Sequence, residues 1–147
     1  MSDLGKRTIY VGAGANNASP LNVEGLAVAA TAAGSLMTQG ASGLSKSAAA
    51  ATVFSTPIFA DKDQMRSKSV DDAWTINENM VAIQGRSGDI LNVLVATAQT
   101  LVHGDPLVSN GAGLLTKGSG ALTQHAVCIA DEATTTSGTS LVRVKIV

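Results

Sequence analysis

The chain has 147 residues, of which 45% are apolar and only 3% aromatic, and it carries a formal net charge of -1 at pH 7. A chain of this length forms one domain with a core of its own, and here that core is built mainly from small side chains. Nucleic acid and anionic membranes attract clustered Lys and Arg, which this composition lacks, so we expect neither as a partner.

The sequence predicts no targeting segment, membrane span or disulfide bond. No apolar stretch of signal-peptide length follows the charges of MSDLGKRTIYVG, and no window reaches about 18 uncharged apolar residues. We therefore expect the protein to be made and kept in a cytoplasm. Cys128 is the only cysteine and lies in the apolar run AVCIA, so we expect a buried thiol.

The first expected element is a strand or an extended arm over residues 7–11, where RTIYV is a β-branched and aromatic run. Turn and loop chemistry follows in GAGANNASPLN, residues 12–22. We interpret residues 1–25 as an extended N-terminal arm and loop. Residues 26–147 are then a single β-rich domain.

The alanine-rich first half is ambiguous between helix and strand. Residues 26–33 (LAVAATAA) have the composition of a helix, but the alternation of Leu26 and Val28 before a glycine favours a strand of small residues. Residues 48–54 (AAAATVF) leave the same two alternatives open. The charged segment 61–74 predicts a surface loop or one helical turn.

The rest of the chain predicts a series of short strands. WTINENMVAIQG, DILNVLVA, PLVSNG, HAVCIADE and LVRVKIV are each β-branched or alternating, and each is bounded by Gly, Asp, Asn or Pro. This pattern is typical of a barrel or a sandwich. We therefore predict an all-β fold, mainly β with little helix, in the form of a small β-barrel or β-sandwich domain with an extended N-terminal arm.

An internal repeat supports this prediction. LMTQGASGLSKS can be laid over LVSNGAGLLTKGS if one-residue slips are allowed, which matches Leu36 with Leu107, Gly40 with Gly111 and Lys46 with Lys117. Further on, PIFADKD from Pro57 parallels VCIADEA from Val127 at nearly the same offset. We interpret these matches as two copies of one unit, made of a strand, a glycine turn, a polar strand, a loop and a strand that ends in Ala-Asp.

The histidines do not predict an active site. His103 and Asp105 stand in a glycine-rich segment, LVHGDPLVSNGAGLLTKGSG, but the other copy of the repeat has neither residue at the matching place. Asn-Gly and Gly-rich pairs supply the positive φ angles that hairpin turns require. His125 has no partner in the sequence. We therefore expect turns here and no catalytic group.

No other sequence pattern predicts a catalytic, metal or cofactor site. IYVGAGANN begins like a dinucleotide fingerprint but lacks its third glycine and the βαβ spacing. The acidic pairs at Asp71-Asp72 and Asp131-Glu132 lie in polar segments where solvated charge is the default. Two histidines and one cysteine are too few for a zinc site, and GRSGD has the wrong spacing for a nucleophile elbow. We expect no enzyme activity, catalytic residue, metal, cofactor or small-molecule substrate.

The last half of the chain carries a family resemblance. Its segment 74–147 contains TLVHGDPLVSNGAGLL, then the strand AVCIADEA and a closing LVRVKIV. This order of turns and strands resembles the β-rich domain of small structural proteins that decorate or cement the capsids of tailed bacteriophages. The resemblance implies no catalytic motif, because the function of that family lies in contacts with the major capsid protein.

The resemblance therefore implies a virion protein that is made in the cytoplasm of a bacterial host. It would bind the outside of the assembled capsid and stabilise the shell by joining neighbouring major capsid protein subunits. Many such proteins sit at three-fold positions, which implies a homo-oligomer such as a trimer. An N-terminal strand suits pairing with a neighbour, and the capsid contacts that we expect are Arg7, Ile9, Tyr10, Val11 and Trp74.

The alternative is a carbohydrate- or ligand-binding β-sandwich module on a virion or cell surface. Such a module needs aromatic platforms, and only Tyr10 and Trp74 are available besides Phe54 and Phe59. A lone tryptophan is more often an anchor in a core or an interface. Quenching of Trp74 fluorescence by a glycan panel would favour this module.

Overall fold

The computed structural model describes residues 6–13, 19–48, 57–120 and 124–147. Their regular elements are all β-strands, so the all-β prediction is confirmed. The strands are β1 (Tyr10–Gly12), β2 (Leu21–Leu26), β3 (Leu36–Gly40), β4 (Gly43–Lys46), β5 (Ile58–Ala60), β6 (Asn79–Gln84), β7 (Ile90–Val95), β8 (Thr100–Leu101), β9 (Pro106–Ser109), β10 (Leu115–Lys117), β11 (Cys128–Ala130), β12 (Thr134–Thr135) and β13 (Ser140–Ile146).

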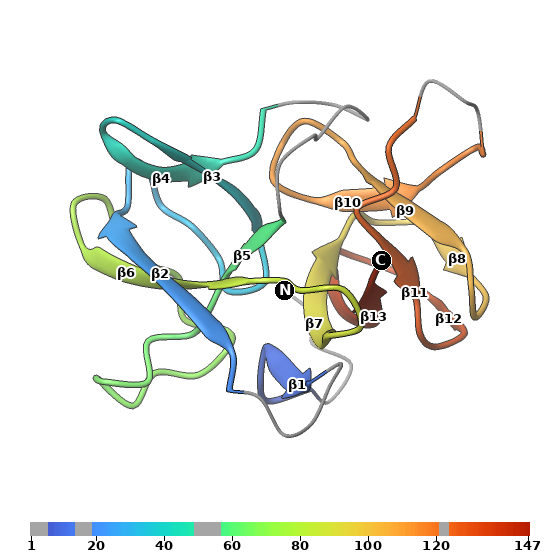
Figure 1. Ribbon diagram of the computed structural model, residues 1–147, viewed down its shortest axis with the longest axis horizontal. Helices are drawn as coiled ribbons and strands as arrows, with labels where there is room; N and C mark the ends of the chain where they lie inside the picture. Colours follow the sequence, from blue (N-terminus) through green and yellow to red (C-terminus); the bar gives the residue numbers. More distant parts are fainter. Residues whose placement is uncertain (1–5, 14–18, 49–56, 121–123) are drawn as a thin grey trace.

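β2 to β6 form a first barrel, which lies on the left in Figure 1. Its strands pair in the order β2-β6-β5-β3-β4, and every pairing is antiparallel. A parallel bridge between Ala27 and Leu44 then brings the last strand back to the end of the first. The N–H of Val28 donates to the Leu44 carbonyl over 3.0 Å at this closure.

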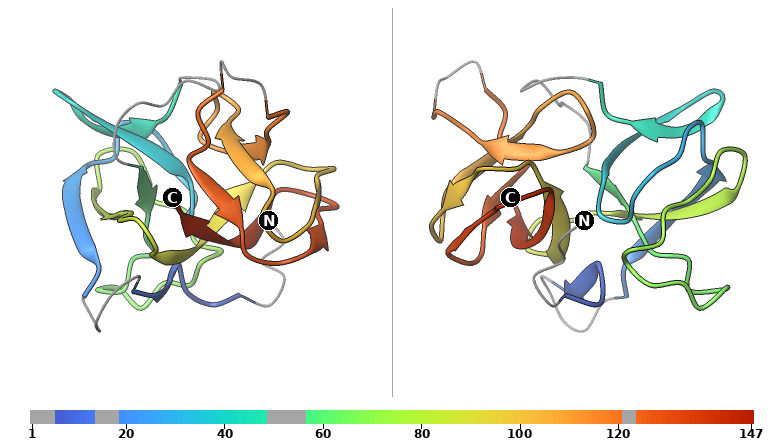
Figure 2. Two further views of the ribbon diagram at one scale, coloured as in Figure 1. Left: turned by 45° about the vertical axis from the view of Figure 1, so that its right-hand side comes forward. Right: turned by 180° about the vertical axis from the view of Figure 1, so that it is seen from behind.

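The strands after β6 form a second barrel, which stands beside the first in all three views (Figures 1 and 2). Their order is β7-β10-β9-β11-β13, and β13 closes the ring by pairing with β7 from Ser140↔Val95 to Lys145↔Ile90. β10 is parallel to β7, while the other pairings are antiparallel. The short strands β8 and β12 form a separate two-stranded ribbon.

The two barrels repeat one topology, as the internal repeat in the sequence predicts. When the strands of each barrel are counted in chain order, each ring runs first, fifth, fourth, second, third, and its third strand is parallel to its first. Met37 lies opposite Lys46 just as Leu107 lies opposite Lys117. Met37, and not Leu36, therefore corresponds to Leu107, which is one of the one-residue slips that the sequence match allows.

A common core joins the barrels. The larger cluster of buried side chains takes members from both, among them Leu36, Phe59 and Ile83 of the first barrel and Leu91, Leu107 and Leu141 of the second. A smaller cluster around Leu44, Trp74 and Met80 fills the first barrel. Each fully buried Leu or Ile contributes roughly 1.5–3 kcal/mol through the hydrophobic effect, so the shared cluster holds the barrels together.

The structure corrects the extent of the N-terminal arm. β2 begins at Leu21 and pairs with β6 from Leu21↔Gln84 to Leu26↔Asn79, so residues 21–25 belong to the first barrel and not to an arm. The sequence LNVEGL is a poor strand former by composition, but pairing along the whole of β6 outweighs that weak local preference. β1 is also docked, since it pairs antiparallel with β7 at Tyr10↔Leu91 and Gly12↔Ile90.

The ambiguous segments resolve in different ways. In residues 26–33 only Leu26 lies in a strand, while Ala27 and Thr31 make isolated bridges, so the preference for a strand holds only at the start of the segment. Residues 49–54 of the second alanine-rich segment lie outside the described residues. The charged segment 61–74 is a surface loop of turns with no helix, which is the first of its two predicted forms.

Candidate functional site

The segment around His103 is a turn, as the sequence predicts. Gly104 has a φ of 93°, and the carboxylate of Asp105 pairs with Lys117 Nζ over 2.8 Å and accepts the Val102 N–H over 2.8 Å. The hydrogen bond from Lys117, followed by the one from Val102, lowers the pKa of Asp105 from its ordinary value. The exposed His103 ring lies 3.1 Å from Asp131 at the surface.

The first barrel has the same turn without the polar pair. Gly34, with a φ of 86°, donates its N–H to the Ala60 carbonyl over 2.7 Å. Gly104 makes the corresponding 2.8 Å bond to Ala130. Ser35 then occupies the place of Asp105, and an alanine occupies the place of the histidine. The conformation is thus reproduced without His or Asp, which supports a structural role for this segment.

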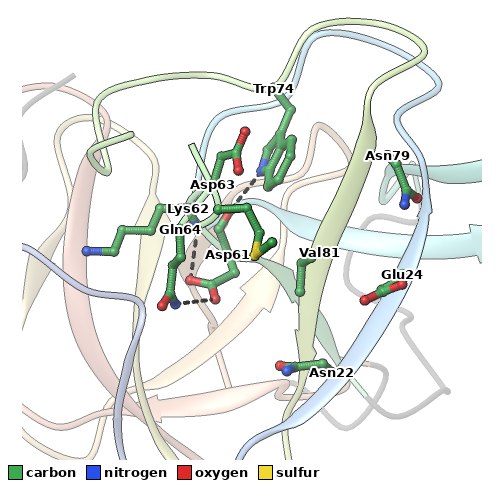
Figure 3. Close-up of a pocket in the computed structure, with 10 residues that line it drawn as sticks. Asn22, Glu24, Asp61, Lys62, Asp63, Gln64, Trp74, Asn79 and Val81 are labelled. Carbon is green, nitrogen blue, oxygen red and sulfur yellow. Dashed lines mark hydrogen bonds between the residues drawn. The ribbon is translucent and has the colours of Figure 1, made fainter. Parts of the chain in front are cut away.

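A hollow of about 440 Å³ lies against the first barrel. Figure 3 shows β2 and β6 along one side of it, and Trp74 with the loop of residues 61–65 along the other. The residues that line it include Asn22, Glu24, Asp61, Asp63, Trp74 and Val81. The hollow is therefore acidic. One of its walls is β2, which the sequence analysis placed almost entirely in the N-terminal arm.

Two buried aspartates shape the loop side of the hollow. Asp61 accepts the Lys62 N–H over 2.8 Å and the Gln64 amide over 3.0 Å (Figure 3). Burial raises the pKa of the Asp61 carboxyl, and these hydrogen bonds oppose the rise. Asp63 accepts the Arg66 N–H over 3.2 Å and pairs with its Nε over 3.2 Å. Both carboxylates thus hold the loop in place.

Trp74 is an anchor of the first barrel. Its side chain is 3% exposed, and the indole N–H donates to the Asp61 carbonyl over 2.7 Å (Figure 3). Its backbone exchanges hydrogen bonds of 3.0 and 2.8 Å with Thr31. A buried ring presents no open face to a sugar, so this burial speaks against an aromatic platform for carbohydrate.

The expected capsid contacts fall into two groups. Arg7 and Val11 are exposed and Tyr10 is half-buried, so these side chains are accessible to a partner. Ile9 is 0% exposed and Trp74 is 3% exposed. Neither of these two can touch a partner in this conformation, which corrects their assignment as contact residues. The local sequence does not reveal this, because the groups that cover Ile9 and Trp74 come from distant parts of the chain.

Three further features bear on the expectations from composition. Within the described ranges, no group of three or more His, Cys, Asp and Glu side chains is arranged to hold a metal ion. The same ranges contain no helix long and apolar enough to cross a bilayer. Cys128 is fully buried, as predicted, and burial raises the pKa of its thiol.

The strand pairings define an all-β protein of two fused barrels. No family model matches the chain, and no curated protein matches it. Among solved structures, the chain is similar to the N base of the head fiber gp8.5 of bacteriophage phi29, with a TM-score of 0.57 and 16% sequence identity. The match covers 88% of this chain and 95% of that one, and at this identity it shows a shared fold.

Proposed function

We propose that this chain is a structural protein of a phage virion, where it decorates the outside of the assembled capsid and cements neighbouring major capsid protein subunits. The observation that carries the proposal is the fold that the chain shares with the base of a phage head fiber over 88% of its length. The turn and strand motifs of segment 74–147, which resemble capsid decoration proteins, support the finer role.

A decoration role needs contact surface and no reaction centre. Binding across the joints between subunits stabilises only the assembled shell, by about 2.7 kcal/mol per site when the free concentration is 100 times Kd. A standard interface of roughly 800 Å² per partner takes a small part of the 6974 Å² of accessible surface. The accessible surface is thus large enough for such a contact.

The proposal includes partners and location. The major capsid protein and further copies of this chain are the partners, and a trimer is the state that a three-fold capsid position would favour. The chain would be made in the bacterial host cytoplasm and reside on the virion. Enzyme activity, nucleic acid, membrane and small-molecule substrates form no part of it.

The copy number per particle tests this proposal. Gel densitometry of purified virions of the phage that encodes the chain is expected to give a large, fixed ratio to the major shell subunit. A handful of copies would contradict decoration and indicate a tail, portal or fibre component. Complete absence from the particles would overturn the virion role itself.

A further inference from the structure

β2 and β7 are the equivalent first strands of the two barrels, but their outer edges differ. β7 pairs with β13 along one edge and receives β1 on the other, where the Asn92 N–H donates to the Ile9 carbonyl over 2.7 Å. β2 pairs with β6 along the corresponding inner edge. Among the described residues, its outer edge pairs only at the bridge from Ala27 to Leu44.

The ladder shows which groups the open edge presents. The N–H of Asp61 in the β5 chain donates to the carbonyl of Val81, so odd-numbered residues of β6 direct their backbone groups toward β5 and even-numbered residues direct theirs toward β2. Val23 lies opposite Ala82 and therefore bonds to β6. Its neighbours on β2 alternate with it, so they direct their N–H and C=O groups outward.

These neighbours are Asn22 and Glu24. The equivalent strand of the other barrel, β7, shows that such outward backbone groups can pair with a further strand. Ala27 bridges Leu44 as Val95 bridges Leu115, so the register places Glu24 at the position of Asn92. On β7 that position binds the N-terminal strand. The outer edge of β2 is thus equivalent to the edge of β7 that binds a strand. Among the described residues, no strand pairs with it.

The surroundings of this edge indicate the kind of strand that fits. The hollow lies over one face of β2 and β6 and is lined by three carboxylates, Glu24, Asp61 and Asp63, against one lysine, Lys62. Glu24 is the carboxylate at the outer edge, because β6 lies between β2 and the loop that carries Asp61 and Asp63. Asp61 and Asp63 are hydrogen-bonded within their loop, whereas Glu24 is exposed and has no ion-pair partner in the described part of the chain. A strand that carries a Lys or Arg complements this charge, and Val81 is the apolar side chain on β6 opposite Glu24.

We propose that the open edge of β2 binds an extended segment of the major shell protein, antiparallel to β2, with an apolar residue next to a Lys or Arg that pairs with Glu24. The N-terminal segment that docks on β7 illustrates this chemistry, since Lys6 and Arg7 precede the apolar Ile9. The strand of a second copy is a poorer occupant, because its departure from β7 would expose an Ile9 side chain that is now 0% exposed. This inference rests on the proposed function, which supplies the partner.

The decisive variant is Glu24→Pro, which removes one outward N–H and places a proline ring on the edge. Proline is tolerated on a strand edge that faces solvent. Gln39→Pro is the matched control, because Gln39 is exposed on β3 beyond Met37, where the pairing with β5 ends. Glu24→Lys is a second variant that reverses the charge and leaves the backbone unchanged. Melting temperatures establish that each variant is folded.

The first measurement is co-sedimentation of each variant with shells stripped of this chain. We expect binding at least tenfold weaker for Glu24→Pro, at least threefold weaker for Glu24→Lys, and unchanged for Gln39→Pro. Shell binding by Glu24→Pro and Glu24→Lys as strong as that of the wild type would overturn the edge proposal and leave the decoration role standing. Self-association of the wild type that Glu24→Pro abolishes would assign the edge to a second copy instead.

The second measurement keeps the edge testable if the wild-type chain does not bind shells, a result that would overturn the decoration role. The probe is a peptide of sequence KRTIYVGA, residues 6–13, titrated into the full chain. Isothermal titration calorimetry measures the binding, because it needs no reporter group at the edge of β2. A saturable heat of binding that Glu24→Pro abolishes supports a strand site, and a flat titration of the wild type overturns it.

Discussion

Ile9 illustrates how a single residue can belong to the core although it lies in an exposed-looking N-terminal segment. Its side chain is 0% exposed in the cluster that both barrels share. The Asn92 side chain fixes the neighbouring backbone by donating to the Thr8 carbonyl over 2.7 Å. The Lys62 ammonium, from the first barrel, donates to the Arg7 carbonyl over 3.0 Å. The segment is therefore held from both barrels.

We expect Ile9→Ala to lower the free energy of unfolding by about 2–5 kcal/mol, because it removes buried methyl and methylene groups and leaves a cavity. Urea denaturation measures the change. Val11→Ala, two residues further along the chain, is the control, since Val11 is 45% exposed, and its effect should stay within about 0.5 kcal/mol. Equal effects of the two substitutions would show that this N-terminal segment does not pack as described.

Asp61 makes stability depend on pH with a definite sign. Burial raises its pKa in the folded protein above the ordinary value of an aspartate, so the folded state favours the protonated form. The stability from Asp61 is fully present below the unfolded pKa and is lost as pH rises through the folded pKa. The Asp61→Asn variant does not show this loss of stability, because an asparagine side chain does not release a proton.

The melting temperature of Asp61→Asn minus that of the wild type is therefore expected to increase as pH rises from about 4 to about 6. Both proteins contain all the other titratable groups, so subtracting one melting temperature from the other removes the pH dependence that comes from those groups. Asp71→Asn, at an exposed position in the same charged segment, controls for the change in net charge. A difference that stays constant over this range, or that falls, would contradict the assignment.

At the scale of elements, the equivalent turns before β3 and β9 separate backbone strain from packing. Gly34 and Gly104 both have positive φ, 86° and 93°. A Cβ on Gly34 would lie 2.6 Å from Leu141 Cδ2 and 3.2 Å from the Leu94 nitrogen, both in the second barrel. A Cβ on Gly104 would meet nothing within 4 Å.

Gly104→Ala should therefore cost about 1–2 kcal/mol from the left-handed backbone alone. Gly34→Ala should cost that amount and about 1–3 kcal/mol more, because the added methyl group overpacks the contact between barrels. Chemical denaturation of the two variants side by side gives the difference. Equal losses would mean that the barrels can shift apart at this turn without cost.

At the scale of the whole molecule, the shared core predicts cooperative unfolding. Trp74 fluorescence reports on the first barrel, whereas far-UV circular dichroism reports on all the strands. Since the larger cluster contains side chains from both barrels, we expect the two thermal transitions to coincide, as they do for a two-state protein. Two separate transitions would show that each barrel is stable without the other.

Residue patterns along the chain predicted part of this architecture. Alternating β-branched runs bounded by turn residues indicated short strands, and the match of Lys46 with Lys117 indicated the duplication that the ladders display. The glycines at the turns were predicted for the same reason, since positive φ is a local demand. β2 was not predicted, because its only strong support is a partner strand more than fifty residues away.

The sequence by itself therefore determined the class of fold, the repeat and the turns, because hydrophobic alternation and glycine placement act over a few neighbouring residues. Only the tertiary structure decided that Ile9 and Trp74 are buried, that the barrels share a core and that β1 pairs with the edge of β7 while the equivalent edge of β2 carries no strand among the described residues. Those features depend on which distant strands meet and in what register. The sequences of β2 and β7 do not indicate which of their edges pairs with another strand. The edge at Glu24 can therefore be recognised only from the structure of both closed barrels.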